Sequence, residues 1–225
     1  MSRHVVVRTF ERIDPEVAKG LAEQGASTVH EADGRRGAFR PELHPLQRGV
    51  RIAGAAVTVS CHPGDNLMIH AAVETVRPGD VVVVTTTSPS TDGMLGDLLA
   101  TSLRAHGAVG VVMDAGVRDA AELRAMGFPV WTRAISPQGT VKASPGSVNV
   151  PVTICGQVVG PGDAVIADDD GIVVVPRDRA AGVLVAARQR TANEESKRAR
   201  LAAGELGVDL YRLRPLLDRL GVEYR

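Results

Sequence analysis

Aromatic residues are scarce in this chain, which has one Trp, two Tyr and three Phe among its 225 residues. Because 44% of the residues are nevertheless apolar, the core must be built mainly from Val, Ala and Leu. Excess charge is also missing, since 26 basic residues balance 26 acidic ones. No basic face is implied, so nucleic acid is not expected as a partner.

Long apolar runs and clustered cysteines are absent as well. No stretch of 18 apolar residues occurs, so no transmembrane helix and no membrane partner are expected. The first eight residues carry charge too early for a secretion signal. Cys61 and Cys155 match no zinc pattern, which favours reduced, buried thiols. We therefore expect a soluble, cytoplasmic protein.

Several motifs of common enzymes are also missing. The six His residues never pair at the spacing of metal ligands. Neither a Gly-x-Ser-x-Gly elbow nor a Walker loop occurs, which removes the commonest signals for hydrolases and for nucleotide binding.

The first 61 residues contain a clear helix start. Asp14 is a favourable cap and Pro15 suits the first helical position, so a helix is predicted to about Gln24 and to end at Gly25. Residues 27–40 are polar and contain Gly, which suggests a surface loop, and residues 51–61 are predicted to form a strand.

Strands and helices alternate from about residue 50 to residue 134, which predicts an α/β unit. Helices are expected at 66–76, 96–106 and 120–126, and strands at 81–84, 109–113 and 129–134. Residues 140–176 are predicted to form an antiparallel β region packed on that unit, followed by helices at 178–203 and 210–220. Length favours a single domain, 1–225, with residues 1–50 as an N-terminal segment and 178–225 as a helical tail.

The stretch from Gly96 to Asp119 holds the residues most able to do chemistry. Leu98, Leu99 and Ala100 lie in the first turn of a predicted helix, where free backbone N–H groups and the helix dipole favour an anion. Asp97 could serve as the cap of this helix.

Arg118 and Asp119 follow a predicted buried strand. They are expected at the same edge of the sheet as the loop at 85–96. An Arg fork suits an oxo-acid carboxylate, and an Asp supplies the oxygen ligand that magnesium or manganese prefers. The alternative interpretation is that Asp119 caps the next helix and Arg118 is solvated.

Three further patterns have simpler interpretations. Asp168-Asp169-Asp170-Gly171 could offer carboxylates to a metal, but a hairpin turn is favoured. The basic C-terminal helix is interpreted as a solvated or interface surface. Pro-Gly-Asp recurs at 63–65, 78–80 and 161–163 with different flanks, which indicates a recurrent turn rather than a repeat.

Five segments together resemble one known family. These are Gly96-Asp97-Leu98-Leu99-Ala100, 114–119 (Asp-Ala-Gly-Val-Arg-Asp), 127–131 (Gly-Phe-Pro-Val-Trp), 161–171 and 200–211. They are similar to the family that contains the 4-hydroxy-4-methyl-2-oxoglutarate and 4-carboxy-4-hydroxy-2-oxoadipate aldolases, together with the regulators of ribonuclease E activity. The tail at 200–211 resembles the aldolase branch specifically.

The resemblance implies an α/β fold with a β/β/α sandwich core and flanking helices, as in the ribonuclease E activity regulators, and a homotrimer or homohexamer with sites between subunits. It implies that Asp119 binds the divalent metal directly, while Asp97 and Glu194 hold its water ligands, with Glu194 from a neighbouring subunit. Glu195 is adjacent and could take the same role. Arg118 would bind the pyruvyl group, with Gly96 and the backbone amides of residues 98–100 completing the pocket.

The activity implied is that of a class II aldolase that uses Mg²⁺, Mn²⁺ or another divalent metal. It would cleave 4-carboxy-4-hydroxy-2-oxoadipate or 4-hydroxy-4-methyl-2-oxoglutarate to pyruvate plus oxaloacetate or pyruvate, with oxaloacetate decarboxylation as a second activity. No Schiff-base lysine is required, which fits the absence of Lys between Gly20 and Lys142. Two alternatives stay open: a non-catalytic regulator that binds a ribonuclease, and an enzyme for a different oxo-acid.

Overall fold

The computed structural model describes residues 4–225. The expectation about a secretion signal concerns a segment whose residues 1–3 lie outside this range. Contacts divide the chain into two compact units, Met1–Ala187 and Arg188–Arg225. Among the helices of the described range, none combines the length and the hydrophobicity needed to cross a lipid bilayer.

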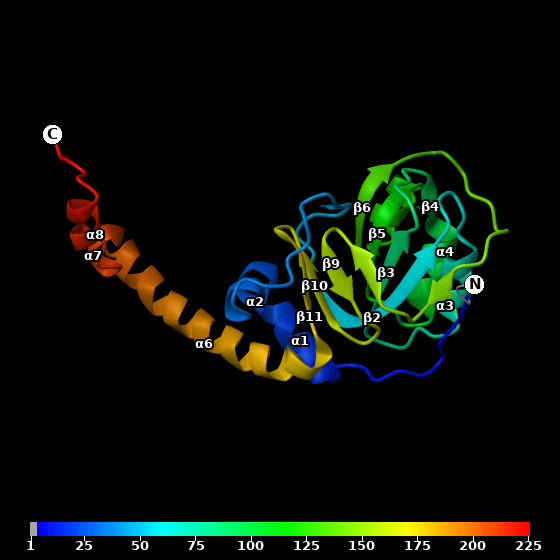
Figure 1. Ribbon diagram of the computed structural model, residues 1–225, viewed down its shortest axis with the longest axis horizontal. Coiled ribbons are helices and arrows are strands. Elements are labelled where there is room, and N and C mark those ends of the chain that lie inside the picture. The colour runs from blue at the N-terminus through cyan, green and yellow to red at the C-terminus, as the bar shows by residue number, and fades with distance from the viewer. Residues whose placement is uncertain (1–3) are drawn as a thin grey trace. The chain divides into compact units, whose positions relative to one another are not determined.

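A mixed sheet forms the centre of the first unit (Figure 1). Its strands run in the order β1-β6-β5-β3-β2-β10-β11, with β4 attached to β5 and β7 attached to β2. The strands are β1 (His44–Pro45), β2 (Ile52–Cys61), β3 (Asp80–Thr86), β4 (Gly93–Leu95), β5 (Gly110–Val117), β6 (Val130–Ile135), β7 (Ser147–Val148), β10 (Ala164–Asp168) and β11 (Gly171–Val175). A separate hairpin pairs β8 (Val152–Ile154) with β9 (Gln157–Val159).

Parallel pairing joins β2, β3, β5 and β6, as the alternation of strands and helices predicts. The connecting helices are α3 (Leu67–Val73), α4 (Asp97–Ala105) and α5 (Ala120–Ala125). They cover one face of the sheet, where β-branched side chains such as Val82, Val84 and Val111 pack against Leu99 and Leu103 of α4. Because the carboxyl ends of these parallel strands meet at one edge, their exit loops lie together there.

The antiparallel strands differ in part from the prediction. β10 and β11 pair with each other and join the main sheet beside β2, so most of the predicted antiparallel region extends the sheet instead of packing on it. The opposite face of the sheet packs a second apolar cluster around Trp131, whose indole N–H donates to the carbonyl of Asp168 at 2.9 Å. The predicted mixed α/β fold with flanking helices is confirmed.

Helix α1 (Pro15–Gln24) confirms the expected cap, because the Asp14 carboxylate accepts from the N–H of Glu16. Helix α2 (Ala26–Ala32) was missed, and the prediction of a loop at 27–40 is wrong for its first part. The reason is a distant cap: Asp168, 142 residues later, accepts the N–H of Ala26 at 2.8 Å.

The hairpin prediction for residues 168–171 is confirmed, because Asp168 pairs with Gly171 across the turn between β10 and β11. The three carboxylates have structural partners. Asp168 accepts the N–H of Asp170, Asp169 accepts the N–H of Gly49, and Asp170 accepts the hydroxyl of Ser27.

Helix α6 (Arg177–Ala202) begins in the first unit, where Ala180, Val183, Leu184 and Ala187 are buried. The second unit holds the rest of α6 with α7 (Gly207–Leu210) and α8 (Arg214–Arg219). Within Arg188–Arg225, all of which the structure describes, no side chain is buried. The division into one domain with a tail stays a prediction.

Candidate active site

Arg118 and Asp119 follow β5 directly, at the carboxyl edge of the parallel strands. Asp119 occupies the cap position of α5, but it makes no side-chain cap hydrogen bond there. Its Oδ2 instead accepts the N–H of Asp97 at 3.2 Å and lies 3.4 Å from Nε of Arg118. The alternative interpretation is therefore wrong in that the Asp119 side chain does not cap the following helix, whereas Arg118 is partly exposed to solvent as that interpretation expected.

The backbone of Asp119 is left-handed, with φ of +52°. For a residue other than glycine this conformation costs about 1–2 kcal/mol, although Asp tolerates it better than most. The Arg118 and Asp119 side chains are 47% and 34% exposed, so their ion pair contributes about 1 kcal/mol at most. Stability does not explain this arrangement, and such outliers are frequent at functional sites.

Gly96 makes room for the pair. A Cβ at this position would lie 2.3 Å from Oδ2 of Asp119 and 3.0 Å from Nε of Arg118. Its φ of −127° is open to any residue, so the requirement for glycine here is one of space alone.

Gly96 is also the cap of α4, and it corrects one part of the predicted anion site. The N–H of Ala100 donates to the carbonyl of Gly96 at 3.0 Å, and Ala100 is fully buried. The Ala100 amide is therefore not available to a ligand. Asp97, Leu98 and Leu99 in the first helical turn remain at the site.

A cavity of about 270 Å³ adjoins these residues. Its lining contains the predicted Gly96, Asp97, Leu98, Leu99 and Arg118. Five lining residues were not predicted from the sequence: Asn66, His70, Gly93, Thr140 and Lys142. The structure thus adds a second side to the pocket, built from α3 and from the chain after β6.

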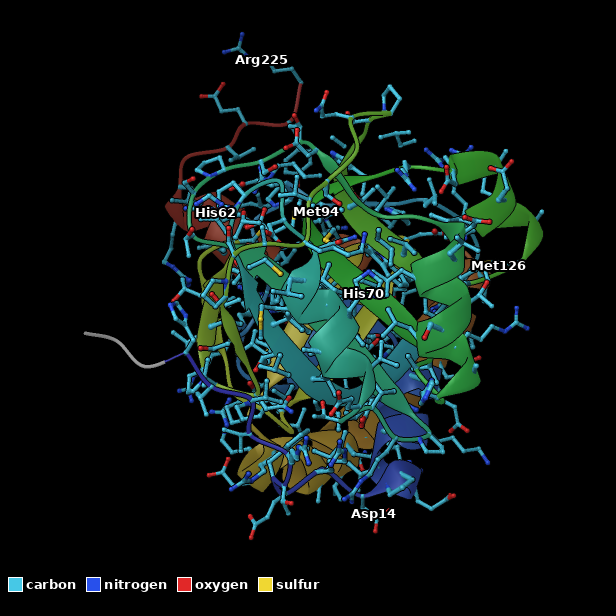
Figure 2. The ribbon with its side chains drawn as sticks, turned by 90° about the vertical axis from the view of Figure 1, so that its right-hand side faces the viewer. Asp14, His62, His70, Met94, Met126 and Arg225 are labelled. Atoms are coloured by element: carbon cyan, nitrogen blue, oxygen red, sulfur yellow. The ribbon has the colours of Figure 1, made fainter. Side chains whose placement is uncertain are left out.

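This second side supplies one ammonium group, one imidazole and one amide. Figure 2 looks onto the face covered by α3, on which His70 is labelled. Asn66 is buried, and its Nδ2 donates to the carbonyl of Met94 at 3.1 Å, while its Oδ1 has no hydrogen-bond partner. Lys142 gives the cavity a second cation besides Arg118. This arrangement suits a ligand with more than one carboxylate.

Two signals in the sequence could have identified these residues. Asn66 and His70 are four positions apart, and so share one face of a helix that follows the turn after β2. Lys142 is the first lysine after Lys19. Neither signal stands out without the sheet topology that brings these segments to the same edge.

The proximity of Lys142 to His70 leads to a first prediction. The protein atoms around the His70 ring lower its pKa, and the charge of Lys142 lowers this pKa further. Lys142→Ala is expected to raise the His70 pKa towards its ordinary value, as followed by NMR of the imidazole through a pH titration. Lys142→Arg, which keeps the charge, should leave the pKa low. An unchanged pKa in Lys142→Ala would contradict the effect of the Lys142 charge on His70.

The lowered pKa of His70 also determines how His70 affects the stability of the protein as the pH changes. The folded protein disfavours the imidazolium, so the unfolded chain binds more protons near the ordinary His pKa of about 6.5. The contribution of His70 to stability is therefore present above that pH and is lost as the pH falls.

The donor set suits a hard divalent metal. In the part of the chain that the structure describes, no three His, Cys, Asp or Glu side chains converge as metal ligands. Mg²⁺ commonly uses only one or two protein carboxylates and keeps several waters. Asp119, whose carboxylate is one-third exposed, and Asp97 beside it fit that mode of binding.

Glu194 is not among the residues that line this cavity. It lies on α6 in the second unit and pairs with Arg190 at 2.9 Å, one helical turn earlier. Glu195 is its exposed neighbour. The predicted role of Glu194 as a residue of a neighbouring subunit stays a prediction.

Asp114 and the cysteines lie outside the site. Asp114 accepts from Nε of Arg133 at 2.7 Å. Cys61 and Cys155 are free and buried, as predicted. Burial raises the pKa of the Cys61 thiol to about 12 and that of Cys155 to about 11.

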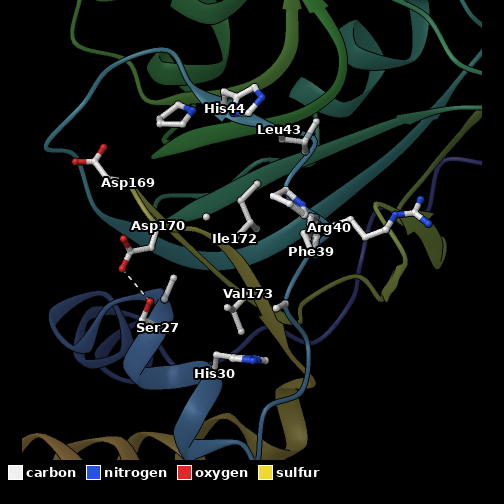
Figure 3. A pocket seen from close by; sticks show the side chains of 15 residues that line it. Ser27, His30, Phe39, Arg40, Leu43, His44, Asp169, Asp170, Ile172 and Val173 are labelled. Carbon is white, nitrogen blue, oxygen red and sulfur yellow. Dashed lines mark hydrogen bonds between the residues drawn. The ribbon is translucent and has the colours of Figure 1, made fainter. Parts of the chain in front are cut away.

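A second cavity, of about 250 Å³, lies between α2, the segment before β1 and the β10–β11 hairpin (Figure 3). Figure 3 shows His30 and Phe39 on its wall and the hydrogen bond from Ser27 to Asp170. The acidic groups here hold the hairpin in place, and none of the residues predicted for the site lies in this cavity.

Comparison with known proteins places the chain in a family. The model of the RraA-like family, described as Aldolase/RraA, matches residues 20–174. The chain belongs to this family. The predicted resemblance is thereby confirmed.

Three RraA-like relatives illustrate the similarity. A protein of Halalkalibacterium halodurans named "Putative 4-hydroxy-4-methyl-2-oxoglutarate aldolase" is 29% identical over 75% of this chain and 80% of its own. A protein of Albidiferax ferrireducens with the same name is 39% identical over 66% of this chain and 89% of its own. The crystal structure of Streptomyces coelicolor RraAS2, described as an unusual member of the RNase ES inhibitor RraA protein family, superposes with a TM-score of 0.75. It is 32% identical and covers 84% of this chain and 99% of that protein.

Proposed function

We propose that this RraA-like protein is a divalent-metal-dependent aldolase that cleaves 4-carboxy-4-hydroxy-2-oxoadipate, 4-hydroxy-4-methyl-2-oxoglutarate or both. The single observation that carries the proposal is the position of the Asp119 carboxylate, which is turned away from its own helix onto the start of α4 beside Arg118. The relatives named as 4-hydroxy-4-methyl-2-oxoglutarate aldolases support this substrate class.

In this proposal the substrate lies with its pyruvyl end towards Arg118. The guanidinium forms paired hydrogen bonds with the carboxylate and the 2-oxo oxygen. The positive end of α4, with the amides of Leu98 and Leu99, adds favourable electrostatics for this anion. Lys142 and His70 receive the carboxylate at the other end of the substrate.

The reaction breaks the bond between C3 and C4. The proton of the 4-hydroxyl passes through a water to the Asp97 carboxylate, and C4 becomes a carbonyl carbon. The electron pair of the broken bond moves towards the 2-oxo oxygen, where Arg118 stabilises the negative charge of the enolate. A proton from water then adds to C3 of the enolate and gives pyruvate. A divalent metal held by Asp119, with Asp97 and the partner's Glu194 on its waters, would supply Lewis-acid polarisation of the 2-oxo group.

Loss of CO₂ from oxaloacetate develops charge on the same 2-oxo oxygen. Decarboxylation of oxaloacetate is therefore part of the proposal. The proposal includes a homotrimer or homohexamer in which Glu194 acts at a neighbouring subunit's site.

The test is pyruvate release from each substrate, followed through lactate dehydrogenase and NADH. Turnover is expected with Mg²⁺ or Mn²⁺, loss of at least about a hundred-fold with chelator, and recovery when metal is restored. Added pyruvate must be consumed normally in the chelator, which controls for the coupling enzyme. Full turnover in chelator would remove the metal from the proposal. No turnover of either substrate, together with tight binding to a ribonuclease, would favour the regulator instead.

A further inference from the structure

The chain between β6 and β7, residues 136–146, crosses the proposed site and is called the strap here. It contributes Thr140 and Lys142 to the cavity. Its first part is held by Gly93, whose N–H donates to the carbonyl of Gln138 at 2.8 Å. Its central residue Val141 exchanges backbone hydrogen bonds with Gly64 and Asn66, at 3.0 and 3.1 Å.

Asp65 fastens the remainder of the strap. Its side chain is buried, and Oδ2 accepts the N–H groups of Ala143 at 2.8 Å and Ser144 at 2.6 Å. Oδ1 accepts the N–H of Leu67 at 2.9 Å, at the start of α3. One carboxylate therefore ties the strap to the first turn of α3.

The charged state of this carboxylate is favoured by its partners. Burial alone would raise the Asp65 pKa, but the backbone N–H groups that donate to it hold the pKa below its ordinary value. A neutral amide would have to present its NH₂ group to some of the same donors, so the hydrogen-bond pattern is specific for a carboxylate.

The two segments joined by Asp65 supply several of the residues that line the cavity together with Arg118. Asn66 and His70 come from the α3 side, and Lys142 comes from the strap. Asp65 itself does not line the cavity.

We propose that Asp65 is a positioning residue that holds Lys142 at the cavity beside His70 and so selects substrates with a distal carboxylate. This role rests on the proposed aldolase function. Asp65 does not contact the substrate. It affects substrate binding only by fixing the position of Lys142. Loosening the strap should harm recognition of the distal carboxylate more than chemistry at the pyruvyl end.

The experiment compares wild type and Asp65→Asn in two reactions. For 4-carboxy-4-hydroxy-2-oxoadipate, kcat/KM should fall at least about thirty-fold, mainly through KM, because a charged contact worth about 2 kcal/mol is misplaced. Deuterium exchange into the methyl group of pyruvate, which needs only the Arg118 end, should change less than about three-fold. Equal losses in both reactions, or an unchanged KM, would overturn the positioning role.

A double-mutant cycle tests whether Asp65 acts through Lys142. In a Lys142→Ala background, adding Asp65→Asn should reduce kcat/KM by less than about three-fold, because coupled residues do not contribute independently. Losses that multiply would contradict the coupling. Inactive wild type in both reactions would instead refute the proposed function itself, and the positioning role with it.

The sequence offers a matched control in another Pro-Gly-Asp turn. Asp163 accepts the N–H of Gly160 at 2.8 Å and that of Arg177 at 3.1 Å, and it is not among the residues that line the cavity. Asp163→Asn removes a carboxylate that likewise accepts backbone N–H groups. It should leave the KM for 4-carboxy-4-hydroxy-2-oxoadipate within about two-fold of the wild-type value. A matching rise in KM would show that the effect of Asp65→Asn is general destabilisation.

Two further measurements keep the proposal testable if Asp65→Asn folds poorly. Hydrogen exchange at the amides of Ala143 and Ser144 should quicken at least ten-fold when the carboxylate is lost, since both donate to it. Ala143→Pro removes one of these donors from the exposed strap without touching the core. It should raise KM in the same direction, and an unchanged KM would count against the proposal.

Discussion

Asp119→Ala is expected to reduce turnover of 4-hydroxy-2-oxo acids by at least about a thousand-fold and to abolish tight Mn²⁺ binding measured by calorimetry. The physical reason is that the Asp119 carboxylate forms an ion pair with Arg118, which lines the cavity, with Oδ2 3.4 Å from its Nε. Removing it leaves the start of α4 and the guanidinium without their negative partner.

Asp119→Asn removes the negative charge of the side chain but keeps the backbone conformation. Asn tolerates the left-handed conformation with φ of +52°, so this variant should fold as the wild type does and still lose activity. Glu122→Ala, an exposed acid in the first turn of the same helix, is the matched control and should remain active. Near-normal turnover by Asp119→Asn in the presence of Mg²⁺ would refute the role of the carboxylate.

Gly96→Ala is expected to lower kcat about a hundred-fold with little loss of stability. The new Cβ would lie 2.3 Å from Oδ2 of Asp119, so the carboxylate must move out of place. A displacement of this size is enough for a hundred-fold loss at a reacting centre. The carboxylate is one-third exposed and can rotate, so the free energy of unfolding should fall by less than about 2 kcal/mol.

The matched control for Gly96→Ala is Gly182→Ala. Gly182 lies within α6 with no atom within 4 Å of its Cβ position, so alanine there should be tolerated in both activity and thermal melting. Wild-type kcat in Gly96→Ala would show that the Asp119 carboxylate need not occupy its observed place.

The sequence predicted the parts of the fold whose causes are local. Helix α1 is specified by Asp14, Pro15 and Gly25, all within or beside it. Helix α2 escaped prediction because its N-terminal partner is Asp168, at the far end of the sheet. The pairing of β10 with β2 likewise depends on contacts between distant residues.

The same distinction applies to the site. Gly96 and the Arg118-Asp119 pair were predicted because each follows a strand and stands beside a helix start. The direction of the Asp119 side chain could not be predicted, since a residue at the cap position of α5 is ordinarily expected to cap it. Lys142 was missed because the strap has no regular secondary structure, and His70 was missed because only the folded chain brings α3 beside the strap.

The strap also bears on how specificity can evolve in this fold. It is held through the backbone of Val141, Ala143 and Ser144, so its attachment does not depend on the side chains of Thr140 and Lys142. Those two positions can therefore accept new residues without detaching the segment from the sheet. Because different groups attach the strap and contact the ligand, single substitutions at Thr140 or Lys142 can change ligand specificity while Arg118 and Asp119 stay unchanged.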